Sequence, residues 1–344
     1  MREASQGMAQ KQSSGVIAPL TKSEGADTLL VIGADIGGTS LRMGLADGTG
    51  AMLARWTCST VDTRDSEGVV RLMREGADAL LLEAGVTPDS VCAIAAGAPG
   101  ITDADSGVVI ATSYLMGWRD VPLRAMLESE FGVPASVDND VNLAAMGEQR
   151  AGVAQGERDF VFLSIGTGIG AGIVLNGTVH RGSIWTAGEI GYMLVPGAEE
   201  APVERGQPGA LEAIVGGEGI KSEWKKRWSR ELTTLPLEAT ATQIFDEALA
   251  SNAMAQEVLQ LAGRTLAYAI YNMSLILNSR LFVLGGSVGV HPALGDAVRQ
   301  QLQMRRARIQ PELMHSALGR DAQLIGAIYL ALETANRRTS EGVS

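Results

Sequence analysis

One pattern occurs twice in this chain and restricts its fold more than any other feature. An apolar strand runs into a loop of glycine and threonine, a second strand follows, and a turn dipeptide then reverses the chain. The first copy covers residues 29–56 with its loop at residues 35–39, and the second covers residues 160–177 with its loop at residues 166–170. A chance likeness of two hairpins is the alternative, but a repeated unit is typical of a structure built twice. The pattern therefore predicts two related halves.

Turn and helix signals between the strands indicate the fold class. Asp47-Gly48 and Asn176-Gly177 are strong hairpin-turn dipeptides. Apolar residues at helical spacing, with capping residues and stops, predict helices at residues 65–85, 258–277 and 321–335. Strands that alternate with helices indicate an α/β protein, and the hairpins make its sheets mixed and not purely parallel.

The length predicts two domains, because 344 residues are more than one compact core usually holds. We expect a smaller N-terminal α/β lobe at residues 28–137 and a larger C-terminal α/β lobe at residues 138–320. The final helix, at residues 321–337, is expected to pack back on the first lobe. Residues 1–27 are rich in Ser, Gln, Gly and Lys and have no apolar core, so we expect a disordered tail and not a signal peptide.

Charge and composition exclude several classes of protein. The net charge of −11 argues against nucleic acid as a partner, because such a surface repels phosphate. The two cysteines, Cys58 and Cys92, form neither a disulfide framework nor a metal cluster and fit a reducing compartment. No run of 18 apolar residues is present, so no membrane association is expected. We expect a cytoplasmic protein.

Glycine is enriched where a ligand would approach the backbone. The chain has 42 glycines in 344 residues, or about 12% against roughly 7% on average. Three loops that contain glycine follow apolar strands, and backbone N–H groups in such loops can bind phosphate oxygens. Neither a P-loop nor a dinucleotide-binding fingerprint is present. The candidate phosphate-binding residues are Gly37, Gly38, Thr39, Gly166, Thr167, Gly168, Gly285 and Gly286.

Two aspartates next to these loops are candidates for chemistry. Asp35 places a carboxylate among phosphate-binding amides, which suits an outer-shell partner of Mg²⁺ on a nucleotide. A turn-forming aspartate is the alternative. Asp140 stands at the start of a helix expected over residues 143–150, where an anion is stabilised and can act as a base or an acceptor. Plain N-capping by Asp140 or Asn139 explains this segment equally well.

Two glutamates are candidates for binding a sugar. Glu189 and Glu212 each lie among small residues, and a carboxylate can accept paired hydrogen bonds from vicinal hydroxyl groups. Glutamate on a solvated surface is the alternative for each of them.

Taken together, these residues resemble the ROK family of bacterial sugar kinases and sugar-responsive repressors, in the actin/hexokinase/Hsp70 superfamily. The resemblance covers residues 29–336. Besides the three glycine loops, it depends on Gly97-Ala98-Pro99-Gly100, residues 117–123, Asn139-Asp140, residues 144–148 and Gly188-Glu189-Ile190-Gly191.

The resemblance implies a two-lobed actin-like ATPase fold, of the ribonuclease H-like type, with an interlobe cleft. It implies that Asp140 is the general base for a sugar hydroxyl and that the first two glycine loops hold the phosphates of ATP-Mg²⁺. Gly285 and Gly286 would line the adenosine pocket. Implied contacts of the sugar are Asn139, Asp140, Glu189, Glu212, Gly97 and Tyr192.

The chain departs from the family at its zinc site and before residue 117. Many members bind zinc through one His and three Cys, whose positions here hold Tyr192, Val203, Arg205 and Ala210. We therefore expect no zinc, and because that His usually contacts the sugar, Tyr192 leaves the substrate open. Tyr114 stands where Asn-Leu is common, and its phenol either alters which hexose fits or merely packs.

The leading hypothesis is an ATP-dependent hexose kinase that acts on glucose, with a homodimer expected. Other hexoses and N-acetylated amino sugars stay open as substrates. A sugar-responsive repressor is disfavoured, since the tail is too short for a helix-turn-helix domain. A non-catalytic sugar binder is disfavoured by the intact set of Asp35, Asp140, Glu189 and Glu212.

Overall fold

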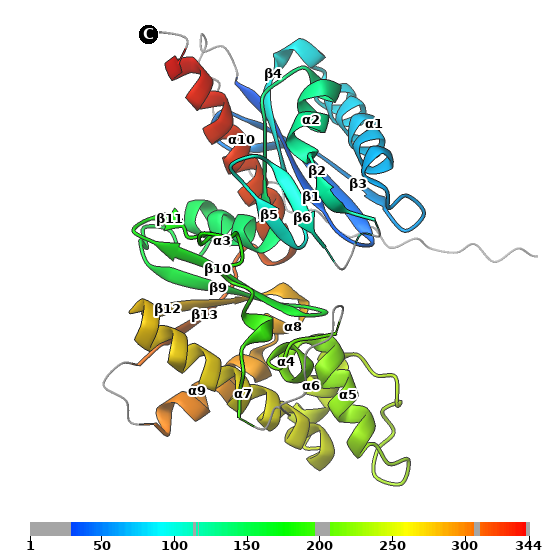
Figure 1. Cartoon of the computed structure of the whole chain (residues 1–344). Coiled ribbons are helices and arrows are strands. Elements are labelled where there is room, and N and C mark those ends of the chain that lie inside the picture. Colours follow the sequence, from blue (N-terminus) through cyan, green and yellow to red (C-terminus); the bar gives the residue numbers. More distant parts are fainter. Residues whose placement is uncertain (1–28, 113–114, 116, 197–206, 306–309, 342–344) are drawn as a thin grey trace, which may run out of the picture.

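Two five-stranded sheets of identical strand order organise the chain, one in each lobe (Figure 1). The computed structural model describes residues 29–112, 115, 117–196, 207–305 and 310–341. The upper sheet has the order β3-β2-β1-β4-β8 and the lower sheet the order β11-β10-β9-β12-β13. The upper strands are β1 Leu30–Ile36, β2 Ser40–Asp47, β3 Met52–Ser59, β4 Val91–Ala98 and β8 Ala135–Asn139. The lower strands are β9 Phe160–Ile165, β10 Ile169–Leu175, β11 Thr178–Val179, β12 Leu281–Gly285 and β13 Glu312–His315.

Strand direction also repeats between the two sheets. In the upper sheet β1 pairs antiparallel with β2 and parallel with β4, and β4 pairs parallel with β8. In the lower sheet β9 pairs antiparallel with β10 and parallel with β12, and β12 pairs parallel with β13. The repeated pattern of the sequence is thus two copies of one sheet topology, and the expectation of mixed sheets is confirmed. A third, three-stranded sheet lies beside the upper one and contains β5 Ile101–Asp103, β6 Val108–Ala111 and β7 Arg119–Val121.

The turns of the two copies differ. Asn176 and Gly177 both have positive φ, 54° and 82°, and join β10 directly to β11 as expected. The hairpin turn expected at Asp47-Gly48 is present, with Gly50 N donating to Asp47 O at 2.9 Å. It is longer than a two-residue turn, because the Asp47 side chain accepts hydrogen bonds from the N–H groups of Thr49 and Ala51 at 2.9 and 3.1 Å. This bonding extends the connection to Ala51 and moves the positive φ, 85°, to Gly50.

Helices cover both faces of each sheet (Figure 1). One face of the upper sheet carries α1 Ser66–Ala84 and α2 Leu123–Phe131, while α10 Ala322–Glu341 packs on β1 and β4. The lower lobe contains α4 Glu212–Val215, α5 Gly217–Arg227, α6 Ala241–Leu249, α7 Ala253–Leu277, α8 Gly286–Gly289 and α9 Pro292–Gln303. Short 3₁₀ helices are Pro88–Ser90, Ile190–Tyr192 and Gly319–Asp321.

Capping residues set the ends of the predicted helices. Asp65 caps α1 by accepting from Gly68 N at 2.8 Å, and Gly85 ends it in the left-handed conformation with φ 67°, as expected. α7 begins at Ala253, five residues before the expected start, because Asn252 accepts from Ala255 N at 3.1 Å and caps an additional turn.

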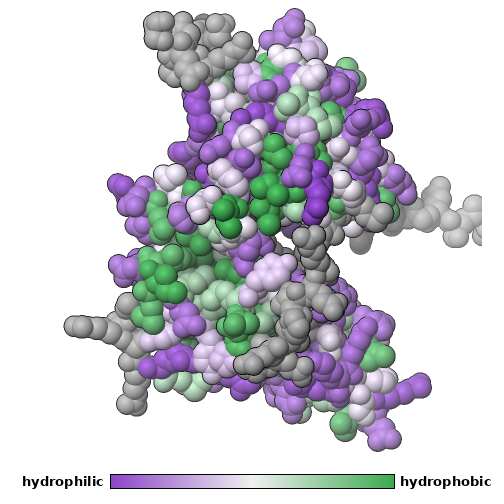
Figure 2. All heavy atoms as spheres, in the orientation of Figure 1, coloured by the Kyte–Doolittle hydropathy of each residue, from purple (hydrophilic) through white to green (hydrophobic). Residues whose placement is uncertain are grey.

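Two helices lie between the sheets and connect the lobes. α3 Asp140–Ala151 follows β8, and α10 follows β13 through residues 316–321. The two helices pack so closely that a Cβ on Gly326 would overlap the carbonyl oxygen of Leu143. Around them lies an apolar core with residues from both sheets, including Val31 of β1 and Phe162 of β9. In Figure 2 the molecule narrows between the lobes, and apolar residues gather along this waist.

Some expectations fall outside what the structure tests. The predicted tail at residues 1–27 lies outside the described residues. The lobe limits, residues 28–137 and 138–320, stay a prediction. Among the described residues, no helix is long and apolar enough to cross a membrane.

Candidate active site

The carboxyl ends of three neighbouring parallel strands bring the first candidate residues together. Asp35 of β1 is in register with Gly97 of β4, and Gly97 is in register with Asp138 of β8. α3 begins at Asp140, two residues after Asp138. Because parallel strands of an α/β sheet end at one edge, residues far apart in the sequence meet there, and such edges are usual ligand sites.

The structure resolves the roles of Asn139 and Asp140 at the start of α3. Asn139 is the N-cap, since its Oδ1 accepts from the N–H groups of Val141 and Asn142 at 2.9 and 3.1 Å. Its Nδ2 donates to Gly100 O at 2.9 Å. Asp140 occupies the first helical position and is therefore not the residue that caps α3.

Asp140 titrates near neutrality. Burial, and next the negative charge of Asp35, raise the pKa of Asp140 to about 7. The hydrogen bond from Val141 N to its Oδ1, 2.9 Å long, opposes this rise in pKa. Gly97 leaves room beside it, because a Cβ there would lie 3.5 Å from the Asp140 Cα and 2.9 Å from Leu143 Cδ1. A carboxylate with such a pKa is suited to general base catalysis at physiological pH.

Asp35 is buried and paired with an arginine that sequence reasoning missed. Only 7% of Asp35 is exposed, and Arg42 Nε donates to its Oδ2 at 3.0 Å. Burial raises the pKa of Asp35, while the charge and hydrogen bonds of Arg42 oppose that rise. The hairpin contained the signal for this pair, because Arg42 stands directly opposite Asp35 in the β1–β2 register.

The loop between β1 and β2 holds Gly37, Gly38 and Thr39. Its ends are fixed by Gly37 N donating to Ser40 O at 2.8 Å and by Thr60 N donating to Thr39 O at 3.2 Å. The Thr60 hydroxyl also donates to Gly37 O, at 3.0 Å. Thr39 itself is exposed, so its hydroxyl is accessible to a ligand.

Glu189 and Glu212 form a second pair of acids, on the lower lobe. Glu212 begins α4 and accepts from Ile169 N at 3.1 Å, which ties it to the start of β10. Partial desolvation and the negative charge of Glu212 raise the pKa of Glu189. The two carboxylates are therefore close enough to repel each other, and hydroxyl groups that donate hydrogen bonds to them would stabilise the pair. Tyr192 follows closely and is 56% exposed.

Two backbone segments of the lower lobe, residues 216–218 and 285–286, pack against the second glycine loop and the strand that leads into it. Gly217 N donates to Gly166 O at 2.8 Å, and Glu218 N donates to Thr167 O at 3.2 Å. Gly168 lies in the same contact, since a Cβ on Gly216 would be 3.2 Å from its Cα. Gly286, with φ 79°, lies against Ile165, and Gly285 packs on the ring of Phe162. The sequence around Gly216 and Gly217 carries no signal beyond a turn, so this contact is visible only in the structure.

Arg181 is a second residue that sequence reasoning missed. Its Nε donates to Asp138 Oδ2 at 2.9 Å. No motif surrounds Arg181 in the sequence, and the two residues are 43 positions apart. Only the folded chain reveals this pair.

Two of the four positions that hold zinc ligands in many family members are described by the structure. Tyr192 and Ala210 are described, whereas Val203, Arg205 and also Tyr114 lie outside the described residues. Across the part of the chain that the structure describes, no group of three or more His, Cys, Asp or Glu residues could hold a metal ion. The absence of zinc stays a prediction.

Comparison with known proteins gives the family. The ROK family matches residues 31–334. This chain belongs to the ROK family. A ROK glucokinase from Streptomyces griseus, solved in complex with glucose and AMPPNP, has a TM-score of 0.73 at 25% identity, over 88% of this chain and 99% of that one. The two-lobed actin-like ATPase fold implied by the sequence resemblance is thereby confirmed.

Several curated relatives of this ROK protein are sugar kinases by name, and others are xylose repressors. A glucokinase from Halalkalibacterium halodurans is 31% identical over 319 residues, which cover 89% of this chain and 96% of that protein. A beta-glucoside kinase from Listeria monocytogenes is 29% identical over 307 residues, which cover 88% of this chain and 97% of that protein. The likeness thus extends over nearly the whole length of both relatives.

Proposed function

We propose that this ROK protein is an ATP-dependent sugar kinase that phosphorylates a hexose hydroxyl group, with glucose converted to glucose 6-phosphate. One observation carries the proposal. A carboxylate whose pKa is raised to about 7, Asp140, stands at the first turn of α3 beside Asp35 and within the electrostatic influence of Glu189. This combination supports a role for Asp140 as the base, at a point where residues of both lobes meet.

In the proposed reaction, Asp140 accepts the proton of the sugar hydroxyl. The sugar oxygen then forms a bond to the γ-phosphorus of ATP, and the bond between that phosphorus and the β,γ-bridging oxygen breaks to release ADP. Little covalent chemistry falls to the protein in such a transfer, so positioning and charge neutralisation dominate.

Asp140, Asn139, Glu189 and Glu212 would hold the sugar. Asn139 uses its Oδ1 for capping and one N–H for Gly100, so the amide retains a second N–H for a sugar oxygen. Glu189 and Glu212 would accept from vicinal hydroxyl groups. Gly97 leaves the space beside Asp140, and Tyr192 lies near Glu189 on the adjacent 3₁₀ helix.

The glycine loops fit the phosphates of ATP. At Gly166 the fold itself has room for a side chain, because the nearest described atom to an added Cβ is Ser287 Oγ at 3.7 Å. The backbone there also lacks a positive φ. A ligand that approaches the backbone explains the glycine, which supports phosphate binding by Gly166, Thr167 and Gly168. Gly37, Gly38 and Thr39 would bind phosphate from the upper lobe, and Gly285 and Gly286 would line the adenosine side.

The acids near the upper loop fit a magnesium ion. The repulsion between Asp35 and Asp140 is the kind of unfavourable contact that a cation relieves, and Asp35 would be its outer-shell partner. Arg42 occupies Oδ2 of Asp35, so we expect contact through Oδ1 and water. When bound, Mg²⁺ would neutralise charge on the β- and γ-phosphates.

Other sugars are alternative substrates. The beta-glucoside kinase among the relatives supports a glycoside, and Tyr192 at the usual His position supports an altered sugar site. A non-catalytic, regulatory sugar binder is the remaining alternative. A homodimer in the cytoplasm stays a prediction from the sequence and the family resemblance.

The test is a coupled assay of ADP release over a panel of hexoses, N-acetylated amino sugars and β-glucosides, with ATP and Mg²⁺. We expect turnover with glucose. Asp140→Asn should lower kcat by about 10²–10⁴-fold while nucleotide binding is retained, because it removes the general base. Asp78→Asn, an exposed aspartate on α1, is the matched control. Full activity of Asp140→Asn, or no turnover of any sugar by the wild type, would contradict the proposal.

A further inference from the structure

An ion pair joins the edge strands of the two sheets beside the catalytic segment. Asp138 belongs to β8, the edge strand of the upper sheet, and it is fully buried. Arg181 follows β11, the edge strand of the lower sheet, by two residues. Its Nε donates to Asp138 Oδ2 at 2.9 Å, and its Nη2 donates to the same oxygen.

The other oxygen of Asp138 holds the start of α3. Asp138 Oδ1 accepts from the Asn139 N–H at 2.8 Å and from Asn142 Nδ2 at 3.1 Å. Asp138 therefore fixes the residue that caps α3 and the first turn of the helix, with Asp140 between them. Without Arg181 its carboxylate would be buried without a counter-charge, which is strongly unfavourable. Rotation of the Asp138 side chain would then disturb both bonds.

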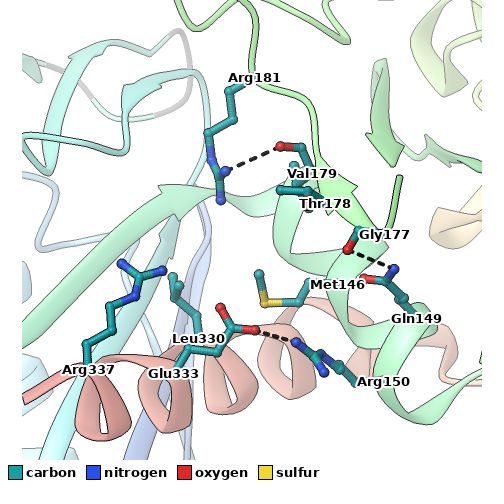
Figure 3. Close-up of a pocket in the computed structure, with 10 residues that line it drawn as sticks. All are labelled: Met146, Gln149, Arg150, Gly177, Thr178, Val179, Arg181, Leu330, Glu333 and Arg337. Atoms are coloured by element: carbon teal, nitrogen blue, oxygen red, sulfur yellow. Dashed lines mark hydrogen bonds and ion pairs between the residues drawn. The ribbon is translucent and has the colours of Figure 1, made fainter. Parts of the chain in front are cut away.

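Arg181 is held in place from the side of the lower lobe. Its Nη1 donates to Val179 O at 3.3 Å, a bond that Figure 3 shows. The side chain borders a cavity of about 190 Å³ between α3, β11 and α10, and 24% of the side chain is exposed. Arg150 and Arg337 line the same cavity, but Arg150 pairs with Glu333 at 2.6 Å. Arg181, in contrast, contacts Asp138 in the segment before Asp140.

We propose that Arg181 is a positioning residue for phosphoryl transfer. Through Asp138 it fixes Asn139 and Asp140 in their reactive geometry and links the β10–β11 hairpin of the lower lobe to the catalytic segment of the upper lobe. The proposal rests on the sugar kinase function proposed above. It predicts that losing Arg181 damages turnover and sugar binding, while the glycine loops that hold ATP are unaffected.

The experiment is a double-mutant cycle with Arg181→Met and Asp138→Asn. Arg181→Met should lower kcat by about 10- to 100-fold, the cost of a small misplacement of a catalytic group. It should also raise the KM for the sugar and leave the KM for ATP within about twofold of the wild type. Because Arg181 acts through Asp138, Arg181→Met should have no further effect on kcat in the Asp138→Asn background. Arg181→Lys should restore part of the activity, and Arg150→Met, in the same cavity, should match the wild type.

Three results would overturn the proposal: an unchanged kcat in Arg181→Met, additive effects in the cycle, or equal increases in the KM values for sugar and ATP. If Arg181→Met does not fold, the double variant Arg181→Met/Asp138→Asn, which lacks both charges, replaces it. A kcat of the double variant equal to that of Asp138→Asn supports the proposal, and a lower kcat overturns it. If the wild type phosphorylates no sugar, the kinase function fails separately. Amide hydrogen exchange then decides: faster exchange at Val141 and Asn142 in the variant, with Gly68 of α1 unchanged, supports positioning, and equal exchange refutes it.

Discussion

The charge of Asp140 changes near neutral pH, and under the proposed mechanism this sets the pH range in which the protein is active. Burial and Asp35 raise the pKa of Asp140 to about 7, and a base must be deprotonated to accept a proton. We expect kcat/KM, with both substrates well below their KM, to decrease on the acid side of about pH 7 and to reach a plateau above it. A profile of kcat/KM from pH 5 to pH 9 tests this. A flat profile down to pH 5 would show that Asp140 is not the titrating base.

The same raised pKa makes stability depend on pH. A carboxyl group whose pKa is higher in the folded state than in the unfolded state stabilises the fold fully below its unfolded pKa, 3.8. That contribution is lost as the pH rises through about 7. Asp140→Asn has no such loss, so its Tm relative to the wild type should be higher at pH 8 than at pH 5. Scanning calorimetry at both pH values tests the sign, with Asp78→Asn as the control that should show no pH-dependent difference.

Gly166 is a glycine that the fold itself does not require, so a substitution there tests whether a ligand requires it. Because an added Cβ would have ordinary contacts there, Gly166→Ala should change the free energy of unfolding by no more than about 0.5 kcal/mol. It should nevertheless raise the KM for ATP, since the methyl group would stand where phosphate approaches. Urea denaturation and ATP titrations measure the two effects. Gly286→Ala is the contrasting variant, and it should destabilise the protein because its φ of 79° disfavours alanine.

Residue patterns in the sequence were sufficient to predict some of these groups and not others. Asp35 and the glycine loops follow apolar strands, so local pattern and chemistry reveal them. Asp140 was ambiguous, because capping and catalysis favour the same residue types at a helix start. Arg181 was not predictable, because its partner lies in another sheet and the sequence carries no record of that contact.

At the scale of elements, Glu148 of α3 joins both connections between the lobes. It is fully buried, and its Oε2 accepts from Val153 N at 2.9 Å. Its Oε1 accepts from Leu318 N at 3.2 Å and from the Ser316 hydroxyl, in the segment that leads into α10. The Glu148 carboxylate thus connects the end of α3 to residues 316–318, which lead into α10. Glu148 therefore has a structural role.

We expect Glu148→Ala to lower the free energy of unfolding by about 3 kcal/mol, because two partly buried amides and a hydroxyl lose their acceptor. Urea denaturation followed by circular dichroism measures the change. Glu83→Ala, an exposed glutamate on α1, is the matched control and should remain near the wild type. A loss in Glu148→Ala no greater than in the control would show that water replaces these bonds.

Element boundaries show where local signals are sufficient. α1 was predictable at both ends, because Asp65 and Gly85 are strong local caps. The longer connection after Asp47 was not, because an aspartate side chain that bonds to the next amides competes with the tight turn that Asp-Gly usually favours. The start of α7 at Asn252 shows the same limit, since an asparagine cap lies outside the apolar periodicity.

At the scale of the whole molecule, the candidate site is divided between two lobes. Asp35 and Asp140 stand at the edge of the upper sheet, whereas Glu189, Glu212 and the Gly166 loop belong to the lower lobe. Binding both substrates should therefore draw the lobes together and exclude water. We expect the radius of gyration from small-angle X-ray scattering to decrease when glucose and AMPPNP are both added. The same radius with and without these ligands would contradict closure.

The last helix of the chain covers one face of the first sheet, and this has a consequence for folding during synthesis. α10 covers the face of β1 and β4 that includes Val31, Ala93 and Ala95. Among the described residues, the main core of the lower lobe, in contrast, is built only from residues between Val161 and Leu313. On the ribosome, the lower lobe can therefore bury its core while the upper sheet still exposes an apolar face. Although it is made first, we therefore expect the N-terminal half to complete its folding last, once α10 is available to cover that face.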